Sequence, residues 1–131
     1  MLSITEKTLQ DLEFTTVLQN IASRCNTELG EEKALKIVPF RDKATLMQNL
    51  SQTSEYLSSF TNQNALPNHG FENCTSELKF LVIEDSFLEL TAFKKIAHLT
   101  ETAITLIQFL NKFSTYYPNL NEATSVLKIE K

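Results

Sequence analysis

Nucleotide binding can be tested directly from this sequence, because its two common motifs need glycines at fixed positions. A phosphate-binding loop needs two glycines five residues apart, followed by lysine and then serine or threonine. A dinucleotide-binding turn needs a comparable run of glycines. The chain contains two glycines, Gly30 and Gly70, far apart in the sequence. This spacing excludes both motifs.

The residues that could hold a metal or act as nucleophiles are also scattered. His69 and His98 are not spaced with Cys25, Cys74 or each other as zinc ligands are. We interpret His69 as a loop residue beside a turn and His98 as a solvated or edge position between apolar stripes. No serine lies in the G-x-S-x-G pattern of a nucleophile elbow.

Charged residues form two acidic pairs and one modest basic cluster. Glu31-Glu32 and Glu84-Asp85 are better explained by helix-dipole complementarity and solubility than by acid–base chemistry. The basic cluster could be a nucleic-acid patch, but it has Phe40 as its only neighbouring aromatic residue, so we favour an ordinary solvated face. Its members are Lys33, Lys36, Arg41 and Lys43. We therefore assign this chain no catalytic, cofactor-binding or metal-binding residue.

The two cysteines, Cys25 and Cys74, are far apart, and each lies on or beside an apolar stripe. We expect buried thiols in a cytoplasmic protein in preference to a disulfide. The tripeptide Asn73-Cys74-Thr75 matches the glycosylation pattern, but no secretory signal opens the chain, so we treat the match as chance.

Length and composition predict one globular all-α domain over residues 1–131. Hydrophobic residues make up 42% and charged residues 21%, with 2 glycines and 3 prolines. So few helix breakers favour a bundle of about five to seven helices, with room for one very short two-stranded contact. No apolar run approaches the length of a membrane span, and we expect no membrane partner. The net charge of −4 counts against strong DNA binding by the isolated chain.

The most informative stretch is residues 12–40, which reads as two amphipathic helices joined by a short corner. The first helix places six apolar residues on one face: Phe14, Val17, Leu18, Ile21, Ala22 and Cys25. Asn26 or Thr27 then caps a second helix, which ends at Pro39. That helix puts Gly30, Ala34, Ile37 and Val38 on one side, and the small residues would let another helix approach closely.

Two further helices flank this pair. A short one over residues 6–12, capped by Thr5 or Ser3, would turn Leu9 and Leu12 inward. Another over residues 43–62, capped by Asp42, carries apolar residues at heptad spacing. These are Leu46, Leu50, Thr53, Leu57 and Phe60. We expect this seam to pack inside a bundle in preference to forming an intermolecular coiled coil.

The second half of the chain opens with a loop over residues 62–71, in which Gly70 can adopt positive φ. A short helix over residues 74–83 would turn Leu78, Leu81 and Val82 inward, and Phe87-Leu88 could pair with the backbone near Phe71.

The longest helix is expected over residues 90–113. It has two adjacent apolar stripes, so neighbours must contact it from two sides. Pro118 suits the first turn of a last short helix. That helix carries Leu120, Ala123 and Leu127, and the chain stops at residues 129–131 without a helix-stop signal.

Residues 12–40 resemble the opening of the second bacterial MutS subfamily, the paralogue of mismatch-repair MutS associated with limiting recombination. The matching segments are Leu12-Glu13-Phe14, Ile21-Ala22-Ser23, Glu28-Leu29-Gly30, Ala34-Leu35 and Pro39. Weaker similarity continues through Gln52-Thr53-Ser54-Glu55, Leu78-Lys79 and residues 87–90. The chain departs from the family at Glu84-Asp85-Ser86, where a glycine pair is usual.

The resemblance implies that these residues are the first part of a helical core and lever region, in a fragment of a longer cytoplasmic protein. Such proteins resemble branched-DNA-binding ATPases that use ATP and magnesium, with a clamp and commonly a C-terminal nuclease domain. The ATPase and nuclease motifs would lie outside this chain, which would itself be no enzyme. The partners implied are branched or duplex DNA, the downstream core, clamp and ATPase domains, and a second copy of the protein. Because later core helices are missing, we also expect exposed apolar surface on the long or the last helix.

The alternative is a stand-alone helical adaptor that binds a partner helix or peptide with the seam of residues 46–60. A long reading frame with a phosphate-binding loop downstream would favour the first hypothesis over this one.

Overall fold

The computed structural model describes residues 4–127 and 129, and every regular element among them is a helix. In chain order these are α1 (Glu6–Asp11), α2 (Phe14–Ala22), α3 (Glu28–Leu35), α4 (Lys43–Ser58), α5 (Thr75–Phe80), α6 (Leu90–Lys112) and α7 (Pro118–Thr124). The predicted all-α class is confirmed. The short two-stranded contact is wrong, because Phe87 lies exposed in the connector before α6 and pairs with nothing in the described residues.

Three of the predicted helix caps are present. The Thr5 hydroxyl accepts a hydrogen bond from the backbone N–H of Thr8, and the Thr27 hydroxyl accepts one from Gly30 at 3.0 Å. The Asp42 carboxylate accepts from two backbone N–H groups at the start of α4. Hydrogen bonds from the Thr45 side chain and backbone lower the pKa of Asp42. Ser3, the alternative cap of α1, lies outside the described residues.

Small residues hold α2 and α3 together, as expected. Leu18, Ala22 and Ala34 are buried between the two helices. A Cβ atom on Gly30 would lie 2.9 Å from the Thr27 hydroxyl oxygen and 3.5 Å from the Cβ of Cys25, so only glycine fits there without adjustment. The predicted single apolar face of α2 is split, however. Val17 and Ile21 lie on its flank and remain exposed.

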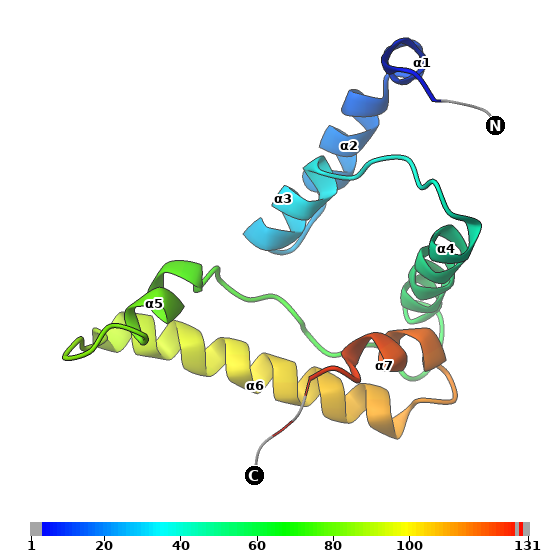
Figure 1. Ribbon diagram of the computed structural model, residues 1–131. Coiled ribbons are helices and arrows are strands. Elements are labelled where there is room, and N and C mark those ends of the chain that lie inside the picture. Colours follow the sequence, from blue (N-terminus) through cyan, green and yellow to red (C-terminus); the bar gives the residue numbers. More distant parts are fainter. Residues whose placement is uncertain (1–3, 128, 130–131) are drawn as a thin grey trace.

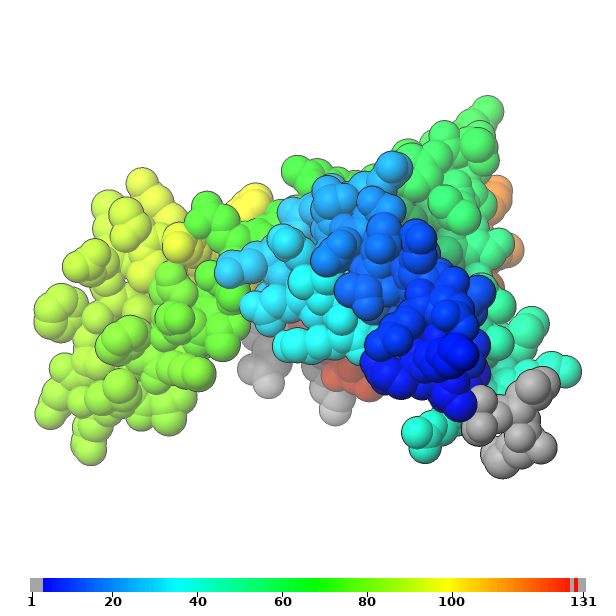
Figure 2. Space-filling view, turned by 90° about the horizontal axis from the view of Figure 1, so that it is seen from above, coloured from blue at the N-terminus to red at the C-terminus, as the bar shows by residue number. Residues whose placement is uncertain are grey.

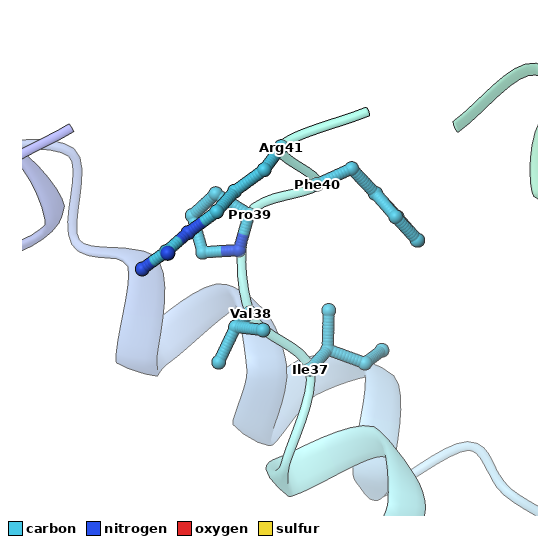
Figure 3. A pocket seen from close by; sticks show the side chains of 5 residues that line it. All are labelled: Ile37, Val38, Pro39, Phe40 and Arg41. Atoms are coloured by element: carbon cyan, nitrogen blue, oxygen red, sulfur yellow. The ribbon is translucent and has the colours of Figure 1, made fainter. Parts of the chain in front are cut away.

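Several predicted helix ends are too long. Helix α3 stops at Leu35, so Ile37 and Val38 lie in the connector (Figure 3), because residues before Pro39 are pushed towards extended backbone. Helix α4 stops at Ser58, where the hydroxyls of Ser58, Ser59 and Thr61 bond back to carbonyls three residues earlier. Such side-chain bonds compete with helix continuation. Leu12, expected inward, is exposed at the end of α1.

The remaining helices form a second group. Figure 1 shows α5 lying on one end of α6 and α7 on the other, with α4 against α7. Ile107, Leu110 and Tyr117 are buried where α6 meets α7. The ring centroid of Phe109 lies 4.7 Å from the ring centroid of Phe113 and 5.8 Å from that of Tyr117. The expected contact from two sides is therefore wrong for the described residues, because α5 and α7 contact opposite ends of α6 and Leu90 and Phe93 remain exposed.

The region of α5 differs most from expectation. The helix ends at Phe80, and Leu78, Leu81 and Val82 are exposed instead of inward. The residues that face α6 are Cys74, which is buried, and Glu77, which bonds to Lys95.

Backbone geometry in this half also departs from the sequence expectation. Gly70 does not adopt positive φ. Asp85 does, with φ of 60°, in the turn between α5 and α6.

The two groups, α1–α3 and α4–α7, make no helix–helix contact with each other in the described part of the chain. Residues 36–42 link them, and Figure 1 shows the resulting open arrangement. In the view from above in Figure 2, the first group (blue to cyan) lies in front of the second. The chain exposes 10673 Å². A compact monomer of this mass would expose roughly 7,000 Å². The expected exposed apolar surface is present on α6, where Leu90 is 68% and Phe93 is 60% exposed, and further exposed apolar side chains lie on α2 and α4.

Candidate interaction surface

One side of α4 is polar and binds α7. The Glu55 carboxylate accepts hydrogen bonds from the backbone N–H of Asn119 at 2.9 Å and of Leu120 at 2.8 Å. It also accepts one from the Asn119 side-chain amide. The first N–H groups of a helix have no partner inside it, and a negative charge suits that end of the helix dipole. Helix α4 therefore caps α7 through a single carboxylate.

The start of α7 is anchored a second time by Tyr117, which is fully buried. Its hydroxyl donates to the backbone carbonyl of Asn64 and accepts from the side-chain amide of Asn62 at 2.9 Å. The Asn62 side-chain oxygen in turn accepts from the backbone N–H of Asn64 at 2.8 Å. This network ties the loop after α4 to the beginning of α7.

The loop is also held to α4 through His69, which is half-buried. Its Nε2 lies 3.3 Å from the Tyr56 hydroxyl oxygen, and its Nδ1 lies 3.0 Å from the Pro67 carbonyl oxygen. The structure thus gives His69 the position in a loop that the sequence predicted, with partners that hold the loop. His98 is exposed on α6, in agreement with a solvated position.

The opposite side of α4 is apolar and exposed. Leu57 is 60% exposed, and Met47, nearer the start of the helix, is also exposed. Phe60, in the turn that follows α4, is 70% exposed. We call this surface the α4 seam, made of Leu46, Leu50, Thr53, Leu57 and Phe60 with the neighbouring Met47. The prediction that the seam packs inside a bundle is wrong for the described chain, because α7 is bound by the polar side of the helix instead.

The four residues of the basic cluster lie on different elements of the chain. Lys33 and Lys36 are exposed on and after α3, while Arg41 and Lys43 flank the start of α4. The Lys36 ammonium lies 3.7 Å from a Glu32 carboxylate oxygen. An open pocket lies beside the cluster, but consecutive residues 37–41 line it, so no groups from different elements meet there (Figure 3).

Both cysteines are thiols: Cys74 is buried and Cys25 is half-buried beside Gly30. Burial raises the pKa of the Cys74 thiol, and the nearby Glu77 carboxylate adds to the effect. No three His, Cys, Asp or Glu side chains gather as a metal site within the described residues. Over the same residues, no helix combines the length and apolar character that crossing a membrane requires.

Sequence reasoning missed the roles of Glu55 and Tyr117. A signal for each was present, because Glu55 ends the segment Gln52-Thr53-Ser54-Glu55 that carries part of the family resemblance, and Tyr117 directly precedes Pro118. What the sequence could not supply was the pairing of α4 with α7, which brings together residues more than sixty positions apart.

Comparison with known proteins gives one informative relative. The chain is 29% identical over 119 residues to the protein named Endonuclease MutS2 of Staphylococcus haemolyticus (strain JCSC1435). The match covers 89% of this chain and 14% of that protein, so the chain spans a small part of the relative's length. No protein-family model matches the chain, and no solved structure does. The similarity supports a relationship to MutS proteins.

Proposed function

We propose that this chain is a non-catalytic helical framework segment of a MutS-like DNA-binding protein, and that the rest of a longer polypeptide covers its exposed apolar surface. The observation that carries the proposal is the extent of the match: most of this chain aligns with a small part of a much longer endonuclease.

The amount of exposed surface supports the proposal. The chain exposes 10673 Å². This exceeds the value for a compact monomer by roughly 3,700 Å², whereas a standard interface takes about 800 Å² from each partner. The apolar part is spread over α2, the α4 seam and the turn after α5, where Val17, Leu57 and Val82 are examples. A large partner that contacts several faces fits this distribution better than a small ligand does.

The α4–α7 contact suits a mechanical role. Glu55 fixes α7 on α4, and Tyr117 fixes it on the loop after α4, through hydrogen bonds that are directional and, in part, charge-assisted. A group held in this way moves as one body, so it can pass a displacement from one end of a protein to another. In the parent protein that the resemblance implies, the displacement would link ATP binding elsewhere to the grip on branched DNA.

A chimera tests this function. The 119-residue segment of the staphylococcal relative is replaced by the matching part of this chain, and ATP hydrolysis and nucleotide-dependent binding of a four-way DNA junction are measured. We expect the chimera to keep both activities and the isolated chain to show neither. ATP turnover by the isolated chain, or a folded chimera that no longer couples nucleotide to DNA binding, would overturn the proposal.

The second candidate is a stand-alone helical adaptor, favoured by the exposure of the α4 seam. The length of the complete transcript separates the two. A reading frame that continues into a phosphate-binding loop supports the framework function, and one that ends after residue 131 supports the adaptor.

A further inference from the structure

The turn between α5 and α6 carries the two most exposed large apolar side chains of the described residues, Val82 and Phe87, each 87% exposed. We call residues 80–93 the α5–α6 tip. Figure 1 shows it at the end of α6 that lies away from α7. Seven large apolar side chains of the tip are exposed. At roughly 100 Å² each, they offer roughly 700 Å², close to one partner's share of a standard interface, about 800 Å².

Hydrogen bonds within the tip fix its shape before any partner binds. The backbone N–H of Ser86 donates to the Ile83 carbonyl at 3.2 Å, and the Ser86 hydroxyl donates to the Phe80 carbonyl. The Lys95 ammonium, 3.3 Å from a Glu77 carboxylate oxygen, holds α5 on α6 beside the turn. A surface that is formed in advance loses less conformational freedom when it binds, so the tip is suited to docking.

The charges on the tip have one sign. Glu84, Asp85 and Glu89 are exposed, and the tip contains no lysine or arginine. Lys79 and Lys94 lie just outside its two ends. Charges select among apolar partner surfaces, because like charges that meet across a contact disfavour it. The tip therefore fits an apolar groove whose rim carries lysine or arginine, and it does not fit one with an acidic rim.

Building on the framework function, we propose that the α5–α6 tip docks into an apolar groove with a basic rim, in the part of the longer polypeptide outside this chain. The match covers 14% of the staphylococcal relative, so most of the relative's length is available to supply that groove. Because tip and groove belong to one polypeptide, their effective concentration is high. A contact of this size is then enough to hold the tip in place.

Hydroxyl-radical footprinting of the chimera described above tests the docking, because it reports the exposure of individual side chains. Phe87 should react several-fold more slowly in the chimera than in the isolated chain. Glu84→Lys with Glu89→Lys should restore most of this reactivity, because basic groups would then face the basic rim. The matched pair Glu31→Lys with Glu32→Lys adds the same charge at exposed residues of α3 and should leave Phe87 protected.

The docking and the framework function can fail separately. A chimera that couples nucleotide to DNA binding while Phe87 stays as reactive as in the isolated chain overturns the docking alone. Loss of coupling with Phe87 still protected overturns the framework function and supports the docking.

A peptide probe gives a second measurement that does not need the chimera. The probe is an amphipathic helical peptide with leucine on one face and lysine on its flanks, and fluorescence anisotropy follows its binding to the isolated chain. The Lys pair at Glu84 and Glu89 should weaken binding by roughly tenfold, and the pair on α3 should change it little. Equal weakening by both pairs overturns the proposal, because it shows attraction to net charge alone. Self-association that the tip pair abolishes also overturns it, because it assigns the tip to a second copy.

Discussion

At the scale of single residues, the Tyr117 hydroxyl ties the start of α7 to the loop after α4. It is fully buried and bonds to Asn62 and to the Asn64 carbonyl. Tyr117→Phe should lower the free energy of unfolding by about 1–2 kcal/mol, because it leaves buried partners unsatisfied. Tyr116→Phe, at an exposed neighbour, should change it by less than about 0.5 kcal/mol. Urea denaturation of both variants measures the difference, and equal values would contradict the network.

A second prediction concerns Lys95. This residue of α6 pairs with α5 and with the loop that precedes α5. Its ammonium lies 3.3 Å from a Glu77 carboxylate oxygen and 3.4 Å from one of Glu72. The hydrogen bonds that the Lys95 ammonium donates to Glu77 and then to Glu72 raise the pKa of Lys95 above its ordinary value of 10.5. A backbone hydrogen bond at Glu77 and then the bond from Lys95 lower the pKa of Glu77 below 4.5.

The sign of the pH dependence follows from these directions. The contribution of Glu77 is present above pH 4.5 and is lost as the pH falls through its lowered pKa. The contribution of Lys95 is present below pH 10.5 and is lost as the pH rises through its raised pKa. Glu77→Gln should therefore flatten the acid limb of a plot of melting temperature against pH. The matched change Glu101→Gln, at an exposed residue of α6, should leave that limb as it is.

At the scale of elements, the capping of α7 by α4 gives the third prediction. Glu55→Ala removes the acceptor for two backbone N–H groups and should destabilise the fold by about 2 kcal/mol, and Glu55→Gln should cost about half as much. Hydrogen exchange should show the loss of protection at Asn119 and Leu120 first. Uniform loss over all helices would argue against a local cap.

The turn between α5 and α6 gives the fourth prediction. Asp85 has φ of 60°, a conformation that glycine adopts freely and that costs other residues roughly 1 kcal/mol. Asp85→Gly should thus be more stable than Asp85→Ala by about 1 kcal/mol in thermal unfolding. At Glu101, exposed in the middle of α6, the order of the glycine and alanine variants should reverse, because glycine is the poorer helix former. The resemblance expects glycine in this turn, and the backbone conformation supplies the reason.

How far the sequence predicts the elements depends on which interactions form them. Caps such as Thr27 and Asp42 were predictable, because they involve residues two or three positions apart. Whether the apolar face of α4 is buried was not predictable from the sequence. Periodicity marks an apolar face on this helix but does not say whether this chain contains the surface that covers it. Glu55 and Tyr117 are missed for the same reason, since their partners lie more than fifty positions away.

At the scale of the whole molecule, the chain consists of two groups joined by residues 36–42, with no helix–helix contact between them in the described residues. Each group has its own buried residues: Leu18, Ala22 and Ala34 in α1–α3, and Ile107, Leu110 and Tyr117 in α4–α7. Cooperative unfolding depends on shared contacts, so the two groups should open independently.

Hydrogen exchange on two core variants tests this independence, which is the fifth prediction. Leu18→Ala should lower the free energy of opening that hydrogen exchange reports for α2 and α3 by about 2–3 kcal/mol. The same quantity for α6 and α7 should stay unchanged. Leu110→Ala should do the reverse. If Leu18→Ala lowered protection in α6 and α7 as well, the group α1–α3 would be packed on the group α4–α7 in solution, and the α4 seam would be the first surface to examine for that contact.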